Sequence, residues 1–418
     1  MKVFLGACSN HEPWQQIALA LYEDNALAAY HTSFADNYRT PIAKMIRRWL
    51  GRVWPALDRQ LQRRRIRTIP EELIETRGFW EIVRTLATKI GLGARPVDWL
   101  FARVECGLDQ DCAQRMAQPQ VGAFMGVEHG SLLSIRAAHR GGKKSIVTFV
   151  SPHHAFREKW VDTEYEKFPE LLTPATRRLL DLGRIRDERR DREAAEADCI
   201  VTLSHLVTQT LIDAGFSKEK IVTVPLGSPA PATDFQRPGS LNGPIKFIFA
   251  GAVSVGKGAH YLLDAWRQLN ASKTAELHFY GSRLLPDRCV QNLPPNTYFH
   301  GSVPREKLFE AFQTGSILIF PTLCDGFGTV VTEAMAHRLP VITTPNAGAS
   351  SLIEEGRNGF LIAPANPAAL AVRMQWCLNH LEELRAMRLN AQTTAQGFTW
   401  EDFRISFRER MRPFLNNG

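Results

Sequence analysis

The sequence has few cysteines and no long apolar run. Its seven cysteines are scattered and odd in number, and no two of them form a CxxC pair. Neither a disulfide framework nor a zinc site is indicated, since both need paired or closely spaced cysteines. No apolar run approaches the roughly 20 residues of a membrane-spanning helix. This cysteine usage fits the reducing cytoplasm.

The chain has the size and composition of a two-domain globular protein. It contains 418 residues, of which 44% are hydrophobic and 22% charged. These values are those of ordinary globular proteins. The formal net charge is +8, and the position of the basic residues along the chain decides which partner this charge indicates.

Much of the positive charge lies in residues 38–67, where arginines alternate with large apolar side chains such as Trp49 and Trp54. The pattern is typical of an amphipathic helix, which can lie on an anionic membrane with its aromatic rings at headgroup level. A solvated helix packed on its own domain explains the pattern equally well. Nucleic acid is not predicted as a partner, because no nucleic-acid-binding motif accompanies the charge.

Residues 317–344 form the stretch around which the chain is organised. An apolar strand at 317–320 is followed by the turn Asp325-Gly326-Phe327-Gly328, a helix over 329–337 and a second strand at 341–344. Strand, loop, helix and strand in this order make the building unit of a doubly wound parallel sheet. The sequence therefore predicts an α/β fold of this class.

The loop within this stretch has the features of an anion site. Glycines let the backbone approach a ligand closely, and the N–H groups of Gly328, Thr329 and Val330 face the same point with the positive end of the helix dipole. Asp325 and Glu333 lie on either side of the predicted anion position and do not occupy it. A carboxylate can accept two hydrogen bonds from a vicinal diol. Phosphate and sugar hydroxyls are therefore the predicted contacts.

This arrangement resembles the donor site of the retaining, nucleotide-sugar-dependent glycosyltransferases of family four, which have the GT-B fold. Their signature is an acid, then glycine–aromatic–glycine, and a second acid eight positions after the first. Here it reads Asp325-Gly326-Phe327-Gly328 and Glu333. Asp325 departs from the usual glutamate and shortens the reach by one methylene. The resemblance implies two Rossmann-like domains facing across a cleft, with the nucleotide sugar held mainly by the second.

A second glycine-rich loop follows the strand predicted at 245–249. It contains Gly251, Ala252, Gly256, Lys257 and Gly258, and nearly spells a P-loop. Gly258 stands where a P-loop has the serine or threonine that holds magnesium, which counts against an NTPase. In family-four enzymes an arginine and a lysine of this loop contact the donor diphosphate; Lys257 matches the lysine, and Ala252 replaces the arginine. The alternative is a plain strand–helix turn with Lys257 in solvent.

Two further loops of the second half belong to the same resemblance. The strand predicted at 276–280 ends at Gly281, and Val303 follows the strand predicted at 297–299. In family-four enzymes the backbone at the second of these places borders the nucleobase. The resemblance therefore implies donor contacts at Gly281 and Val303.

Three histidines follow predicted strands of the first half. His129 follows the strand at 122–127, and His153 and His154 follow the strand at 145–150. Parallel sheets bind ligands beyond the carboxyl ends of their strands, and the resemblance implies a histidine near the reacting sugar. His153 is the first candidate, His154 the alternative, and His129 could line the acceptor pocket. Local packing explains each histidine equally well. A metal site is not predicted, because adjacent side chains point apart and no third ligand is evident.

The predicted domain organisation has four parts. Residues 1–228 form an N-terminal acceptor-binding domain with a helical elaboration at about 36–118, and a Pro-, Gly- and Ser-rich linker spans 229–243. Residues 244–397 form the donor-binding domain, and 398–418 form a helix that returns to the first domain. The acidic pair Asp109 and Asp111, and the charged stretch 184–198, are interpreted as solvated helix faces.

The predicted function is retaining transfer of a sugar from a nucleotide-diphosphate sugar to a hydroxyl of a glycan or lipid-linked acceptor, in surface polysaccharide or glycolipid synthesis. His153, Lys257 and Asp325 are the predicted catalytic residues, and no metal or other cofactor is implied. A nucleotide-sugar epimerase and a non-catalytic sugar-nucleotide binding subunit are the alternatives. The expected location is cytoplasmic, with peripheral contact on the inner membrane face through residues 38–67.

Overall fold

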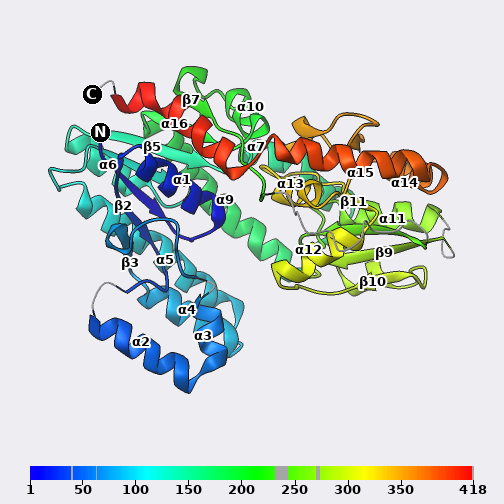
Figure 1. Ribbon diagram of the computed structural model, residues 1–418, viewed down its shortest axis with the longest axis horizontal. Coiled ribbons are helices and arrows are strands. Elements are labelled where there is room, and N and C mark those ends of the chain that lie inside the picture. The colour runs from blue at the N-terminus through cyan, green and yellow to red at the C-terminus, as the bar shows by residue number, and fades with distance from the viewer. Residues whose placement is uncertain (39–40, 63, 231–242, 270–273, 417–418) are drawn as a thin grey trace.

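The computed structural model describes residues 1–38, 41–62, 64–230, 243–269 and 274–416 of the chain. These residues form two parallel β-sheets with helices packed against them, and each sheet lies in its own lobe of the molecule (Figure 1). Both sheets have the strand order of a doubly wound fold. The predicted α/β architecture of two Rossmann-like domains is confirmed.

The first sheet has seven strands in the order β3-β2-β1-β4-β5-β6-β7, and all of their pairings are parallel. Its central strands are buried on both faces, which is why they read as continuous apolar runs. The strands are β1 (Val3–Ala7), β2 (Leu27–Thr32), β3 (Ile74–Thr76), β4 (Ala123–Val127), β5 (Lys144–Phe149), β6 (Cys199–Thr202) and β7 (Ile221–Thr223).

The first half of the chain forms further α-helices between the strands of this sheet. Outside the elaboration they are α1 (Glu12–Glu23), α6 (Leu132–Arg140), α7 (His154–Arg157), α8 (Thr163–Lys167), α9 (Pro174–Glu196) and α10 (His205–Asp213). Ser204 caps α10 by accepting a hydrogen bond from the N–H of Val207 at 3.1 Å, as a serine before a helix is expected to do.

The helical elaboration lies between β2 and β4. It comprises α2 (Pro41–Val53), α3 (Pro55–Gln62), α4 (Phe79–Lys89) and α5 (Ala94–Arg115). In Figure 1, α2 and α3 project from the lower end of the first domain. The elaboration also contains β3, which pairs with β2 at the edge of the sheet. A strand of three residues is too short to show a periodic pattern, so the sequence does not indicate β3.

The second sheet has six parallel strands in the order β10-β9-β8-β11-β12-β13. They are β8 (Ile245–Ala250), β9 (Ala275–Tyr280), β10 (Thr297–Phe299), β11 (Ile317–Phe320), β12 (Val341–Thr343) and β13 (Gly359–Leu361). The helices of this half are α11 (Ala259–Leu269), α12 (Arg305–Thr314), α13 (Thr329–Ala336), α14 (Pro367–Asn379), α15 (Leu381–Gln396) and α16 (Trp400–Asn416).

The last helix, α16, lies along α1 of the first domain (Figure 1). Arg404 of α16 donates to Glu23 at 3.0 Å, and Lys144 of β5 donates to the carbonyl of Phe414 at 2.7 Å. Most of the predicted linker, residues 231–242, lies outside the described residues, and the predicted domain boundaries stay predictions. Among the described residues, no helix is both long and apolar enough to cross a membrane.

One segment of the first half packs on the second domain. It contains the π-helix η2 (Glu158–Asp162), α8 and the 3-10 helix η3 (Pro169–Leu171), and Val161 belongs to the hydrophobic core around Phe249. Glu164 is buried and accepts a hydrogen bond from the hydroxyl of Tyr261 at 2.5 Å. The Nε2 atom of His260 lies 3.2 Å from the same carboxylate. Packing therefore joins this segment to the second domain, although it precedes that domain in the sequence.

The prediction that two charged stretches are solvated helix faces is wrong in part, because Arg184, Glu188 and Arg192 are exposed but other charged residues of these stretches are buried. Asp109 of α5 is fully buried and accepts hydrogen bonds from the N–H groups of Leu133 and Ser134, both at 2.9 Å, in the first turn of α6. On α9, Arg190 and Glu193 are buried as well. A charged side chain can be buried when backbone groups or an opposite charge satisfy it, and sequence alone does not show those partners.

Candidate functional site

Each sheet reverses its strand order at a central point. In the first sheet β1 neighbours β4, and in the second sheet β8 neighbours β11. Doubly wound sheets bind ligands beyond the carboxyl ends of their strands at such switch points. The loops after β8 and β11 are the two glycine-rich loops of the sequence. The topology therefore brings them together at one edge of the second sheet.

Glycines allow the loop after β8 to lie in direct contact with the loop after β9. Gly251 and Gly281 have φ angles of 134° and 147°, and a Cβ on Gly281 would lie 1.9 Å from the carbonyl oxygen of Gly251. Only glycine allows both this conformation and this approach. The next residue, Ala252, is partly buried, and its methyl side chain brings no charge to the loop.

The same loop is held against the loop after β11. The carbonyl of Gly256 accepts hydrogen bonds from the N–H of Leu323 at 2.9 Å and from the hydroxyl of Thr322 at 3.1 Å. A Cβ on Gly258 would lie 1.9 Å from the carbonyl oxygen of Pro321. The serine or threonine of a P-loop does not fit at this position. The structure therefore rejects the NTPase interpretation.

Lys257 and Asp325 form an ion pair between the two loops, and their side chains are 27% and 18% exposed. Asp325 also accepts a hydrogen bond from the N–H of Phe327 at 3.2 Å, which closes the turn. Gly328 has a φ of 80° and precedes the first turn of α13. The structure thus brings the predicted cation and the predicted acid together at the turn that leads into α13, a place called the anion crevice below, and Lys257 does not simply face solvent.

Glu333 lies on α13 next to this crevice. Its carboxylate accepts a hydrogen bond from Arg305 at 2.7 Å. Burial raises the pKa of Glu333, and the Arg305 guanidinium opposes this rise. Arg305 is the first residue of α12, two positions after Val303 in the loop that follows β10. No sequence motif indicates Arg305, because basic residues at the start of a helix are common.

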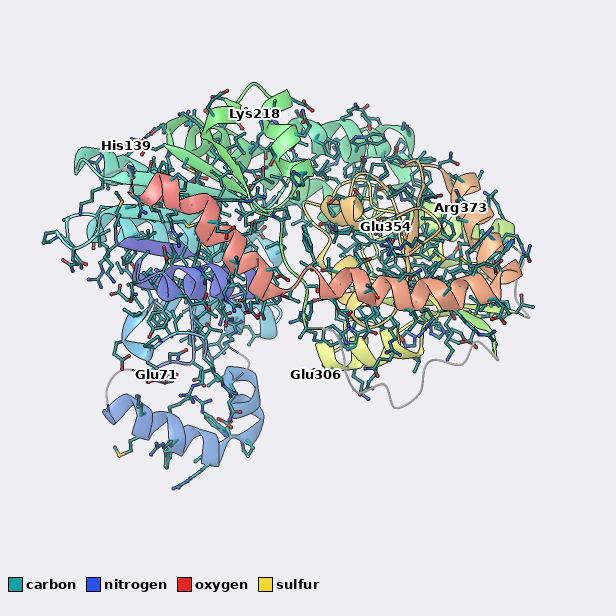
Figure 2. All side chains as sticks on the ribbon, turned by 45° about the horizontal axis from the view of Figure 1, so that its top comes forward. Glu71, His139, Lys218, Glu306, Glu354 and Arg373 are labelled. Carbon is teal, nitrogen blue, oxygen red and sulfur yellow. The ribbon has the colours of Figure 1, made fainter. Side chains whose placement is uncertain are left out.

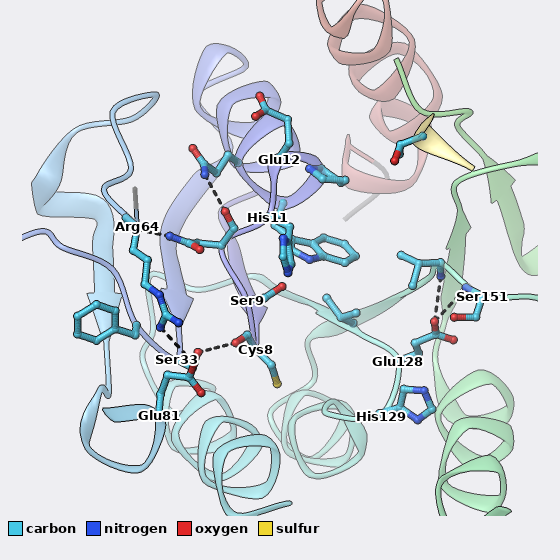
Figure 3. Close-up of a pocket in the computed structure, with 18 of the residues that line it drawn as sticks. Cys8, Ser9, His11, Glu12, Ser33, Arg64, Glu81, Glu128, His129 and Ser151 are labelled. Atoms are coloured by element: carbon cyan, nitrogen blue, oxygen red, sulfur yellow. Dashed lines mark hydrogen bonds and ion pairs between the residues drawn. The ribbon is translucent and has the colours of Figure 1, made fainter. Parts of the chain in front are cut away.

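A cleft of 1030 Å³ lies between the two domains. The loops after β1, β2, β4 and β5 form its first-domain wall (Figure 3). Arg305, Thr329, Thr332 and Glu333 line it from the second domain. Two of the predicted donor contacts, Thr329 and Glu333, therefore face the first domain across this cleft.

His129 lies on the first-domain wall of the cleft, beside Glu128 (Figure 3). Its φ of 76° is unusual for a residue with a side chain, and its N–H donates to Glu193 at 2.7 Å. Strained conformations of this kind cluster at functional sites. Its Nδ1 atom is buried and has no hydrogen-bond partner among the described residues. Burial and neighbouring arginines lower the pKa of His129 to about 3, so the ring is neutral and offers hydrogen bonds rather than charge.

Glu128 and Arg190 support this wall, and the sequence did not single out either of them. Glu128 accepts hydrogen bonds from the N–H groups of Val150 and Ser151 at 3.2 Å and 3.0 Å, and it lies 2.6 Å from Arg190. Arg190 also donates to the carbonyl of Ser151 at 3.1 Å. The pair ties the ends of β4 and β5 together. The only available signal was the position of Glu128 directly after a predicted strand.

The rings of His153 and His154 do not point apart as predicted. Their centroids are 4.1 Å apart, and each Nε2 atom lies 3.1 Å from an oxygen of Asp191. The ligand atoms of these three residues lie within 4.8 Å of one another and could hold a metal ion. The same is true of His154, Glu158 and Asp187. The expectation that no third ligand is present was therefore wrong.

His153 is nevertheless engaged by hydrogen bonds. Its Nδ1 accepts from the N–H of Ala155 at 3.2 Å, so the neutral ring carries its proton on Nε2 and donates it to Asp191. The residue is buried, and burial lowers its pKa. Neither His153 nor His154 lines the interdomain cleft. Their roles beside the sugar or acceptor stay predictions.

Together these features define the class of protein. Two doubly wound domains with a cleft between them make the GT-B architecture. Residues 244–380 match the family described as Glycosyl transferases group 1, and they contain all six strands of the second sheet.

Curated relatives align with part of the chain. D-rhamnosyltransferase WbpZ of Pseudomonas aeruginosa is 27% identical over 194 residues, which are 42% of this chain and 48% of that protein. Uncharacterized glycosyltransferase MJ1607 of Methanocaldococcus jannaschii is 29% identical over 129 residues, which are 30% of this chain and 33% of that protein. The chain thus spans less than half the length of each relative.

Solved structures match the chain over its whole length. Sucrose-phosphate synthase of Thermosynechococcus elongatus superposes with a TM-score of 0.64 at 17% identity and covers 100% of both chains. Anabaena Alr3699/HepE in complex with UDP has a TM-score of 0.59 at 15% identity, covering 99% of this chain and 100% of that one. At these identities the likeness shows the shared fold.

Proposed function

We propose that this protein is a retaining glycosyltransferase that moves a sugar from a nucleotide-diphosphate sugar to a hydroxyl of a glycan or lipid-linked acceptor. The observation that carries the proposal is the convergence of Lys257, Asp325 and the N-terminus of α13 at the switch point of the second sheet. The family of residues 244–380 supports it. The UDP held by Anabaena Alr3699/HepE supports a nucleotide as donor.

The chemistry of the crevice fits this reaction. As the bond between sugar and phosphate lengthens, negative charge grows on the diphosphate. Lys257 and the N–H groups that begin α13, at Thr329 and Val330, supply positive charge already in place. Asp325 can accept hydrogen bonds from the donor sugar, and Glu333 from the ribose diol. The proposed mechanism assigns these roles to protein groups and none to a metal ion.

The acceptor side is the wall formed by the first domain. His129 lies on this wall with a neutral ring, and we assign it to an acceptor hydroxyl. His153, or His154 as the alternative, is assigned to orienting the reacting sugar from the end of β5. The acid–glycine–aromatic–glycine signature is that of retaining enzymes, and this resemblance supports retention of the anomeric configuration.

The proposal extends to a membrane surface on the cytoplasmic side. Residues 36–118 contain sixteen Lys and Arg against ten Asp and Glu, a net +6 of the chain's +8. Ten of the 21 exposed large apolar side chains among the described residues lie between Met45 and Trp99. Positive charge together with exposed apolar side chains is the combination that binds an anionic bilayer.

Helix α4 connects this surface with the cleft. Its exposed residues recur at helical spacing and form one stripe, the α4 stripe: Phe79, Ile82, Leu86 and Ile90, which are 47–73% exposed. The opposite face of the helix carries Glu81 and Arg84, which line the cleft. A saccharide in the cleft would therefore lie one helix away from the bilayer. This arrangement supports a lipid-linked acceptor and a role in surface polysaccharide or glycolipid synthesis.

Helix α2 adds a second apolar row, with Met45, Trp49 and Val53 exposed. Arg47 does not take part in this surface, because its guanidinium donates to Asp36 and Asp58, both at 2.6 Å. It fastens α2 to the domain. The exposed Arg48 and Arg52 are the cations of α2 that remain for lipid headgroups.

A thermal-shift screen followed by a transfer assay tests the proposal. A nucleoside diphosphate that binds the native state raises the melting temperature by mass action, and the matching nucleotide sugar should then glycosylate an acceptor with retention. Donor turnover without any acceptor would favour the epimerase instead. Donor binding without transfer, unchanged by Glu333→Ala, would favour the binding subunit.

A further inference from the structure

Arg305 lies where the two domains face each other. Its Nη2 atom donates to Glu333 at 2.7 Å, and its Nη1 atom lies 3.9 Å from the carboxylate of Glu12 on α1. The guanidinium is 5.1 Å from the centre of the Phe309 ring. Arg305, Glu12 and Glu333 all line the cleft. One guanidinium thus connects carboxylates from both walls.

The ionisation of Glu333 depends on these neighbours. Its side chain is 15% exposed, and burial raises its pKa. Arg305 lowers this pKa, and Glu12 raises it. His337 on the same helix has an Nδ1 atom 2.7 Å from the backbone carbonyl of Glu333, and burial lowers the pKa of His337. A neutral His337 donates to that carbonyl and leaves Arg305 as the charge that favours the carboxylate.

We propose that Arg305 is the positioning residue of the nucleotide site. It holds the Glu333 carboxylate ionised and oriented toward the ribose hydroxyls, and Glu12 opposes it from the first domain. This inference rests on the proposed function, in which Glu333 receives the ribose diol. A carboxylate has about four lone-pair positions, so it can accept one N–H of Arg305 and two hydroxyls together. The rigid guanidinium of Arg305 restricts the orientations of the Glu333 carboxylate in the free protein, so less conformational entropy is lost when the nucleotide binds.

The two partners of Glu333 have opposite effects on pH dependence. Binding of the diol needs the ionised carboxylate. When Arg305 is removed, the pKa of Glu333 rises, so nucleotide affinity falls at a higher pH than in the unmodified protein. When the charge of Glu12 is removed, the pKa of Glu333 falls, so nucleotide affinity falls at a lower pH. Loss of packing alone would not displace the pH dependence of affinity in opposite directions.

Calorimetric titration with UDP and 2′-deoxy-UDP between pH 5 and 8 tests the inference. If another of UDP, GDP, ADP and CDP binds more tightly, that nucleotide and its 2′-deoxy form serve as probes. At pH 7, Arg305→Ala is expected to weaken binding about tenfold, as loss of a charged hydrogen bond does. Arg305→Lys should restore part of the loss. The loss should be smaller for the deoxy form and absent in a Glu333→Gln background.

Arg373 offers a matched control in the same domain, where Figure 2 labels it. It donates to Glu355 at 2.6 Å and lies 4.7 Å from the centre of the Phe360 ring, but it does not line the cleft. Arg373→Ala removes an equivalent pair and should leave nucleotide affinity unchanged.

Three results of the titrations at pH 7 would overturn the inference alone. They are unchanged affinity in Arg305→Ala, equal losses for the ribose and deoxyribose forms, and a loss that persists without the Glu333 carboxylate. Displacement of the pH profile in the same direction by Arg305→Ala and Glu12→Gln would also overturn it. If the unmodified protein binds none of the four nucleotides, the proposed function fails and the inference fails with it.

Discussion

Gly326, in the turn before α13, lies directly against Val150 at the end of β5. A Cβ on Gly326 would be 1.7 Å from the carbonyl oxygen of Val150, and the hydroxyl of Ser204 donates to the carbonyl of Gly326 at 2.5 Å. The two domains therefore meet backbone to backbone beside the anion crevice. The glycine of the signature turn is needed for this contact as well as for the turn.

The variant Gly326→Ala should separate the domains without unfolding them. Because the added methyl group meets backbone atoms, the turn or the first domain has to move. We expect transfer activity to fall at least tenfold and stability to fall by about 1–3 kcal/mol, as overpacking typically costs. Small-angle scattering should show a larger radius of gyration with unchanged circular dichroism.

Gly107 on α5 is the matched control for this variant. A Cβ there meets nothing within 4 Å, and alanine is preferred to glycine inside a helix by about 0.5–1 kcal/mol. Gly107→Ala should keep full activity and a slightly higher melting temperature. Full activity and an unchanged radius in Gly326→Ala would show that the contact has no functional role.

The fold was predictable where residues follow a strong local pattern. The strands predicted at 297–299 and 317–320 coincide with β10 and β11, and the helix predicted over 329–337 corresponds to α13. Residues Gly348–Leu352 form a 3-10 turn that the sequence does not indicate. A few small polar residues do not distinguish a helix from a turn, because neither choice buries an apolar face.

The candidate site was predictable on the donor side and much less so on the acceptor side. Glycines and carboxylates at fixed spacing indicated the crevice of Lys257 and Asp325. Arg190 and Asp191 lie within a run of charges on α9, and such a run does not show which face is buried. Arg305 reaches Glu333 only because α12 and α13 pack against each other in the second domain. Contacts of this kind come from the tertiary fold.

Lys257→Ala should slow transfer about a hundredfold while the fold keeps its stability, since a preplaced charge acts mainly on the developing diphosphate. Lys257→Arg should retain part of the activity, because it keeps the charge. Steady-state kinetics with donor and acceptor varied separately measures both. Lys307→Ala removes another paired lysine, 3.5 Å from Glu310, and should have no effect. Equal rates in Lys257→Ala and Lys307→Ala would contradict the assignment of Lys257.

Glu164 should stabilise the contact between residues 158–171 and the second domain in a pH-dependent way. Burial would raise its pKa, but hydrogen bonds from His260, Lys167 and Tyr261 lower it to about 2, from an ordinary value of 4.5. A lowered pKa contributes stability that is present above pH 4.5 and lost as the pH falls toward 2.

Glu164→Gln should therefore reduce the free energy of unfolding by about 2 kcal/mol at pH 7 and by less at pH 3.5. Urea titrations at both pH values measure the difference. Glu166→Gln, at an exposed position of the same helix, should change stability little at either pH. A loss in Glu164→Gln that is the same at both pH values would show that the carboxylate charge does not matter there.

The α4 stripe should bind the protein to anionic membranes. Replacing Phe79, Ile82, Leu86 and Ile90 together by serine should weaken binding about a hundredfold, because each large side chain contributes up to about 1.5–3 kcal/mol when it leaves water. Arg48→Gln with Arg52→Gln should weaken binding less and reduce its dependence on salt. Flotation with vesicles of phosphatidylcholine, with and without phosphatidylglycerol, measures each effect.

A control for this experiment replaces exposed apolar residues elsewhere by serine, at Val372, Leu389 and Ile405, and should float like the unmodified protein. Nucleotide binding should be the same in all variants, because the stripe lies outside the anion crevice. A concentration-dependent dimer that the stripe variant abolishes would assign this face to a second copy of the chain. If the stripe variant and the unmodified protein float equally well, the apolar face of α4 does not contribute to membrane binding. The membrane would then be removed from the proposal.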